Sequence, residues 1–168
     1  MSADPDRPLI LWAAAALLAL GAFGLMSAGA SATTVYVDDS YGSDTPASHQ
    51  WTTVQKGLYD AAPNDTVYVY NGNYLENVTL STNWVTVQGE SRDGVVIDRQ
   101  SLGNAVFTVR AEHTVLQNLT LKRGNYAVYI DGAAYDNGTL DNITATLINF
   151  DCIYLRYAHD WTIHDTDA

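Results

Sequence analysis

Three charged residues recur at matching positions in the sequence and could together do chemistry. Arg110, Asp131 and Arg156 each follow a short apolar run, and the successive spacings are 21 and 25 residues. If these runs lie side by side as strands, the three side chains point outward from one face. A polysaccharide lyase would need such an arginine base together with clustered acids that hold calcium. The alternative, which we favour, is an exposed charge ladder that stabilises neighbouring strands.

Two tyrosines lie beside these charges at the same spacing. Tyr129 and Tyr154 occupy equivalent positions in their runs, and Thr108 holds that position in the run before them. Stacked tyrosines on a flat face offer apolar area to a sugar ring and a hydroxyl for hydrogen bonding. Aromatic ladders also stabilise strands that bind nothing. We predict a carbohydrate-binding surface formed by Tyr129, Tyr154, Arg110, Asp131 and Arg156.

The spacing of the strands that position these residues predicts the fold. Val109, Ile130 and Leu155 align in one series, and Val115, Thr139 and Thr162 begin the runs of a second series with steps of 24 and 23 residues. Two strand series with a shared period of about 20–25 residues are typical of a coil of parallel strands. We therefore predict an all-β fold, a single-stranded right-handed parallel β-helix.

A short helix is expected before the coil. Apolar residues recur at helical spacing from Trp51 to Ala62, Thr52 and Gln55 fit a capping box, and Pro63 ends the segment. The apolar stripe of this helix must cover something, and almost everything after it is strand. We predict that it caps the N-terminal end of the β-helix.

The segment that contains this helix resembles a known family. The run from Trp51 to Ser91, written WTTVQKGLYDAAPNDTVYVYNGNYLENVTLSTNWVTVQGES, is similar to the opening segment of the pectin-lyase-like superfamily, in which a helix and a Gly-x-Tyr-x-Glu turn precede the coil. Here that turn is Gly72-Asn73-Tyr74-Leu75-Glu76, in which we expect Tyr74 to cover the end of the helix and Glu76 to point outward. The resemblance covers nearly the whole chain after the N-terminal segment and implies the β-helix fold.

Within that superfamily the segment is also similar to pectin methylesterases. That likeness implies two carboxylates, a nucleophile and a general acid, with glutamine amides that hold the oxyanion. Asp151 matches the acid, but Tyr126 and Phe150 stand where amides belong and no second carboxylate motif follows. We therefore keep Asp151 as a weak catalytic candidate and expect it to be a turn residue before a strand.

The N-terminal segment predicts export. Residues 9–26 form an uncharged apolar run, followed by Ala-x-Ala sequences that fit a signal peptidase. We assign residues 1–32 to a signal peptide or an N-terminal membrane anchor and residues 33–168 to the β-helix domain. The sequence stops in or just after a strand, so we expect further turns or a second subunit to cover that end. The domain is expected outside the cell or at its surface.

Composition limits the partners. The formal net charge of −11 disfavours nucleic acid and anionic membranes as partners. Cys152 is the single cysteine of the sequence, which excludes an internal disulfide. We expect a polysaccharide or a component of the cell envelope as partner. The four histidines share no metal-ligand spacing, so we predict no metal site and no cofactor, with calcium unsupported.

Five Asn-x-Ser/Thr sequons occur in the sequence. We predict glycosylation at Asn64, Asn137 and Asn77. Asn118 and Asn142 fall at one register position, where stacked asparagine amides form a ladder that leaves no room for a glycan. The leading hypothesis is a non-catalytic envelope or carbohydrate-binding protein, and the alternative is a carbohydrate-active enzyme, either a polysaccharide lyase or a pectin methylesterase.

Overall fold

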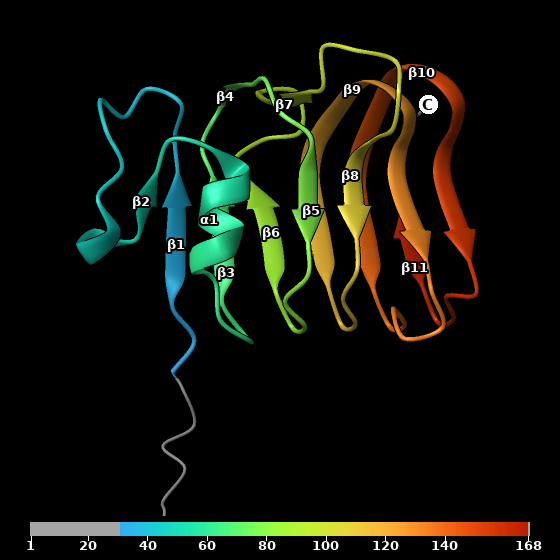
Figure 1. Ribbon diagram of the computed structural model, residues 1–168, viewed down its shortest axis with the longest axis horizontal. Coiled ribbons are helices and arrows are strands. Elements are labelled where there is room, and N and C mark those ends of the chain that lie inside the picture. The colour runs from blue at the N-terminus through green and yellow to red at the C-terminus, as the bar shows by residue number, and fades with distance from the viewer. Residues whose placement is uncertain (1–30, 168) are drawn as a thin grey trace, which may run out of the picture.

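The strands of the computed structural model, which describes residues 31–167, wind into a parallel β-solenoid of about four turns with one short helix (Figure 1). All pairs between its strands are parallel, and together the strands form an 11-stranded sheet. The predicted all-β parallel β-helix is confirmed. Within residues 31–167 no helix is long and apolar enough to cross a membrane. The predicted signal or anchor in residues 1–32 lies almost wholly outside the described residues and stays a prediction.

Each turn contributes a strand to three faces. The first face contains β1 (Thr34–Val37), β3 (Thr66–Val69), β6 (Thr86–Gly89), the beginnings of β9 (Val115–Asp131) and β10 (Thr139–Arg156), and β11 (Thr162–His164), with β2 (Gln50–Trp51) beside β1. The second face contains β4 (Gly72–Tyr74), β7 (Val95–Asp98) and the middles of β9 and β10. The third face contains β5 (Val78–Leu80), β8 (Ala105–Val109) and the ends of β9 and β10.

The register of both predicted series is confirmed. Val109 pairs with Ile130, which pairs with Leu155, and Thr139 pairs with Val115 on one side and with Thr162 on the other. Side chains alternate inward and outward along each strand, so apolar side chains stack in the interior turn upon turn. The largest fully buried side chains include Phe107, Leu116, Leu119, Leu121 and Ile130.

The capping helix is confirmed, but it is shorter than predicted. Helix α1 spans Val54–Asp60, and its N-cap is Thr53, whose side chain accepts the backbone N–H of Lys56. The short η1 turn (Pro46–Ser48) precedes it. Gly57 faces the inward side chains of Val37 and Val67, where a Cβ would clash. The absent side chain lets α1 pack closely on the interior of the first turn.

The predicted capping box is wrong because the Thr52 hydroxyl donates to Asp44 at 2.8 Å and Gln55 bonds residues far along the chain. The Gln55 amide bonds the backbone N–H and C=O of Thr79 on β5, at 2.7 and 3.1 Å. Glu76 does not point outward as predicted: its carboxylate accepts the N–H groups of Val54 and Gln55, at 2.8 and 3.0 Å. Burial raises the pKa of Glu76 although these two bonds oppose the rise. The Gly-x-Tyr-x-Glu segment, whose first three residues form strand β4 rather than the predicted turn, therefore ties the coil to the start of α1.

Candidate functional site: an aromatic groove on the third face

Four aromatic side chains gather on the outer side of the third face. The rings of Tyr129 and Tyr154 stack in parallel, with centroids 5.0 Å apart and planes 3° apart. Tyr126 lies 5.2 Å from each of them, and Phe150 lies 6.0 Å from Tyr126. The pairing of Thr108 with Tyr129 and of Tyr129 with Tyr154 is the one that the sequence predicted. We call these four rings the aromatic cluster.

Tyr126 and Phe150 belong to this cluster although the sequence did not predict them there. Strict alternation would put Tyr126 and Tyr129, three residues apart, on opposite sides of the strand. In β9, however, Ala127 and Val128 are both buried, so the residues on either side of them are both partly exposed. The strand is irregular here, and its partner β10 shifts register between Ile148 and Asp151. Only the structure shows that irregularity.

A groove of about 450 Å³ lies beside the cluster. Its lining combines two aromatic rings with neutral amides and hydroxyls and one cation: Asn77, Thr79, Asn104, Ala105, Thr108, Arg110, Tyr126 and Tyr129. The lining includes no carboxylate, although the whole chain carries a net charge of −11. An open groove with aromatic rings and several hydrogen-bonding groups is suited to a polar ligand that also has apolar faces.

The predicted charge ladder is reduced to a pair. Arg156 donates from Nε to Oδ1 of Asp131 at 2.7 Å and from Nη2 to Oδ2, and the Tyr129 hydroxyl donates to Oδ2 at 2.8 Å. The bonds from Arg156 and Tyr129 lower the pKa of Asp131, and the bond to Asp131 raises the pKa of Tyr129. Asp131 therefore fixes the orientation of the Tyr129 ring.

Arg110 does not join that pair, contrary to the ladder prediction. Strand β8 ends at Val109, and both carboxylate oxygens of Asp131 are already engaged by Arg156 and Tyr129. Among residues 31–167, Arg110 makes no ion pair. Its exposed guanidinium instead lines the groove.

Asp151 lies on this face beside Tyr126, with which it pairs, and its side chain is exposed. The other carboxylate on the strands of this face is Asp131, which is five residues farther along β9 than Tyr126. At about 3.3 Å per residue, the backbone positions of the two aspartates lie about 16 Å apart along the strands. On the described third face, Asp131 is therefore too far from Asp151 to act with it as the second carboxylate of an esterase site.

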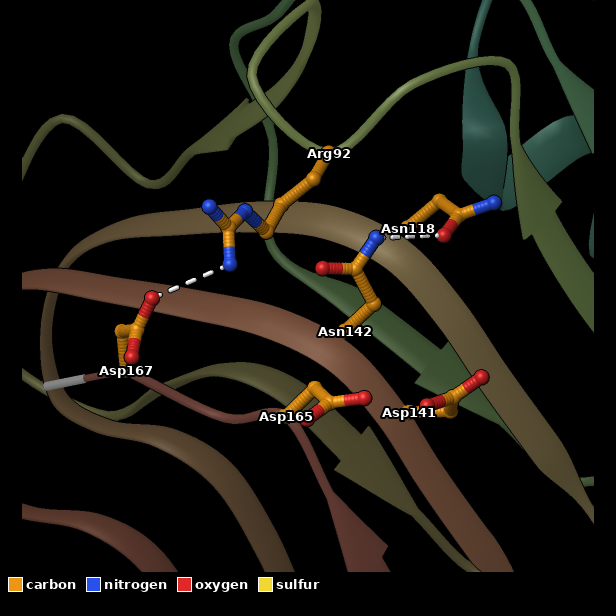
Figure 2. A pocket seen from close by; sticks show the side chains of 6 residues that line it. All are labelled: Arg92, Asn118, Asp141, Asn142, Asp165 and Asp167. Carbon is orange, nitrogen blue, oxygen red and sulfur yellow. Dashed lines mark hydrogen bonds and ion pairs between the residues drawn. The ribbon is translucent and has the colours of Figure 1, made fainter.

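A larger hollow of about 520 Å³ lies at the corner between the first and second faces (Figure 2). It is lined by Arg92, Asn118, Asp141, Asn142, Asp165 and Asp167. Figure 2 shows Arg92 turned toward Asp167, which it bonds at 3.0 Å. The described residues contain no group of three His, Cys, Asp or Glu side chains that could hold a metal ion. With no aromatic ring in its lining, this hollow is a weaker candidate than the groove.

The predicted asparagine ladder forms one wall of this hollow. Asn142 Nδ2 donates to Asn118 Oδ1 at 2.7 Å, and Asn118 Nδ2 donates to the C=O of Gly89 at 3.3 Å. Both asparagines are in the left-handed region, with φ of 57° at Asn118 and 54° at Asn142. Asparagine suits this corner because it tolerates positive φ and its amide satisfies the neighbouring turn.

Replacing Asn142 by Ala should lower the free energy of unfolding by about 2–3 kcal/mol, from the lost hydrogen bond and the cost of positive φ. Asn142→Gly loses the bond but tolerates the backbone, so it should lose less than Asn142→Ala. Urea unfolding of both variants measures the difference. An Ala variant more stable than the Gly variant would contradict the account of this corner.

The three predicted glycosylation sites are exposed: Asn64, Asn77 and Asn137. Asn64 and Asn137 lie in loops with φ of 75° and 59°. Asn118 and Asn142 are partly buried and bonded to each other, as described above. Glycosylation itself stays a prediction.

The comparisons with known proteins bear on the fold. No protein-family model matches the sequence, and no curated protein matches it. Among solved structures, the chain is similar to a pectin methylesterase mutant in complex with a hexasaccharide, with a TM-score of 0.57 and 17% sequence identity. The chain therefore shares the parallel β-helix fold of that enzyme. The match covers 77% of this chain and 48% of that structure, so the chain spans about half the length of the enzyme.

Proposed function

We propose that this protein is exported or held at the cell surface and binds a polysaccharide, without cleaving it, through the groove and aromatic cluster of the third face. The observation that carries the proposal is the parallel stack of Tyr129 on Tyr154 beside a groove lined with amides and hydroxyls. Sugar rings present an apolar face and a hydroxyl rim, which these two kinds of group complement. The solved structure with a hexasaccharide supports the proposal, because in it a protein of this fold is in complex with a saccharide.

The charge in the groove favours an acidic saccharide. Arg110 is exposed and lacks an ion-pair partner among the described residues, while the groove lining holds no carboxylate. A carboxylate or sulfate on a sugar could pair with this guanidinium, which suits planar anions. The partner we propose is therefore an acidic polysaccharide of the cell envelope or its surroundings.

The test is binding to an array of neutral and acidic polysaccharides, with and without calcium. The double variant Tyr129→Ala/Tyr154→Ala should lose binding by tenfold or more, because it removes one of the two aromatic rings of the groove lining together with the ring that stacks on it. Tyr36→Ala is the matched control, since Tyr36 stacks on Tyr70, 6.3 Å away, on the first face, which bears no part of the groove. Wild-type protein that binds no polysaccharide, or a double variant that binds as well as wild type, would overturn the proposal.

Arg110→Gln should reduce affinity for an acidic polysaccharide about tenfold and leave affinity for a neutral one unchanged, because a charge-assisted hydrogen bond contributes about 1.5–3 kcal/mol. Titrations at two salt concentrations provide the measurement, since the wild-type affinity should fall with salt more steeply than that of the variant. Equal losses for neutral and acidic ligands would contradict a role in charge recognition.

The second candidate, a carbohydrate-active enzyme, is favoured by one observation: Asp151 is exposed on the face that carries the groove. Release of methanol or of unsaturated sugar in the binding assay, lost in Asp151→Asn, would establish it in place of the binding role. The distance between Asp131 and Asp151 along the strands argues against a two-carboxylate esterase site.

A further inference from the structure

Asn77 is both a sequon asparagine and a residue of the groove. It lies between β4 and β5 and begins the sequon Asn77-Val78-Thr79. Asn77 and Thr79 line the groove together with Tyr126 and Tyr129. Anything attached to the Asn77 amide therefore starts at the groove.

The side chain of Asn77 is available for modification. It is exposed, and among the described residues no hydrogen bond engages its amide, whereas the amides of Asn118 and Asn142 are bonded in the ladder. The backbone beside it is fixed, because Gln55 bonds both the N–H and the C=O of Thr79. The attachment point thus has a defined position at the groove, and its side chain is unengaged.

We propose that Asn77 carries an N-linked glycan that lies over the groove and controls access to it. In the modification, Nδ2 of Asn77 forms a bond to the anomeric carbon of a phosphate-activated glycan donor. The carbon–oxygen bond to the phosphate breaks, the phosphate leaves with its electron pair, and the amide nitrogen loses a proton. The transferase and the donor would come from the export pathway, so the modification rests on the export that is part of the proposed function.

A tethered glycan has an advantage over a free one. A short flexible tether gives a local concentration in the millimolar range, so the attached sugars exclude a free saccharide that binds with millimolar affinity. The Asn77 glycan would cover Tyr126 directly, because both residues line one groove. This shielding does not depend on the groove binding a free saccharide. Competition with such a ligand does rest on the proposed function.

The experiment uses the full chain secreted from a glycosylating host, with glycopeptide mass spectrometry at each sequon. The reporter is nitration of Tyr126 by tetranitromethane, mapped on peptides. We expect a glycan at Asn77 and nitration of Tyr126 at least fivefold slower in wild-type protein than in Asn77→Gln or in wild-type protein after enzymatic removal of glycans. Tyr129 is unsuitable as a reporter because its hydroxyl is bonded to Asp131.

Two controls separate the possible outcomes. Asn64→Gln removes an exposed sequon outside the groove lining and should leave Tyr126 nitration at the wild-type rate, and nitration of Tyr36 should be equal in all samples. An unmodified Asn77, or a glycan there that leaves Tyr126 nitration unchanged, overturns the proposal. Failure of the proposed function would show separately, as a lack of polysaccharide binding by unglycosylated protein.

Discussion

Replacing Phe107 by Ala should lower the free energy of unfolding by about 3–5 kcal/mol, which is a large part of the ~5–15 kcal/mol typical of a domain. Phe107 is fully buried in β8, where it stacks between Val78 of β5 and Val128 of β9. Its ring occupies the interior between the faces, and the neighbouring strands are held by their hydrogen bonds. The cavity left by the ring therefore cannot close fully, and the loss includes a cavity term.

Urea unfolding followed by circular dichroism measures this loss, provided that the slope with denaturant stays equal to that of wild type. Thr108→Ala, next in the same strand, is the matched control because its side chain is only partly buried and points outward; it should change stability by less than about 0.5 kcal/mol. Equal losses at the two positions would show that the interior of this coil is not packed as described.

The repeat and its register could be predicted because equivalent positions of stacked parallel strands carry side chains of the same kind. Each inward position must present an apolar side chain at the same height in successive turns, so Val109, Ile130 and Leu155 carry the register in their types and spacing. The same period predicts that Tyr129 lies against Tyr154 and that Asn118 and Asn142 form a ladder, as the structure shows. These features depend on the period alone.

The start of α1 could not be predicted because it depends on contacts between distant residues. A capping box uses residues within one helical turn, and Thr52 with Gln55 satisfied that local pattern. In the structure the free N–H groups of Val54 and Gln55 are satisfied by Glu76, 22 and 21 residues away. Glu76 then has no freedom to point outward. Nothing in the local sequence distinguishes a glutamate that caps a distant helix from one that faces solvent.

The groove could be predicted only in part, because it depends on departures from the repeat. The period and the inward–outward alternation predicted the positions of Tyr129 and Arg110. Tyr126 faces the same side as Tyr129 because the two residues between them in β9 are both buried, which alternation does not predict. One wall of the groove contains Asn104, from the segment between β7 and β8, and Ala105, the first residue of β8. The repeat does not predict the conformation of that segment. Loops and strand irregularities of this kind carry the specific features of a regular coil.

Asp98 and Arg123 form an ion pair that the sequence did not suggest. Breaking this pair should have the second large effect on the free energy of unfolding. Arg123 donates from Nε to Oδ1 of Asp98 at 2.7 Å and from Nη2 to Oδ2, and the N–H of Gln100 donates to Oδ1 at 2.9 Å. Asp98 is 1% exposed, whereas the Arg123 side chain is 41% exposed. Asp98→Ala should cost about 2–3 kcal/mol, less than the ~3–5 kcal/mol for breaking a fully buried pair, because the freed arginine reaches water.

The same pair predicts how stability depends on pH. Burial raises the pKa of Asp98, but the hydrogen bonds from Arg123 and Gln100 outweigh it, so the pKa is lowered from 3.8 in the folded protein. A carboxyl group with a lowered folded pKa contributes stability above its unfolded pKa and loses it as the pH falls through the folded value. Wild-type protein should therefore lose this contribution below about pH 4.

Asp98→Asn, which cannot ionise, should lack that part of the acid loss and unfold more easily at pH 7. Asp93→Asn is the control, because Asp93 is 87% exposed in its side chain and its pairing with Arg92 contributes little. If Asp98→Asn and Asp93→Asn gave the same stability profile from pH 7 to pH 3, the Asp98–Arg123 pair could not be the source of the dependence.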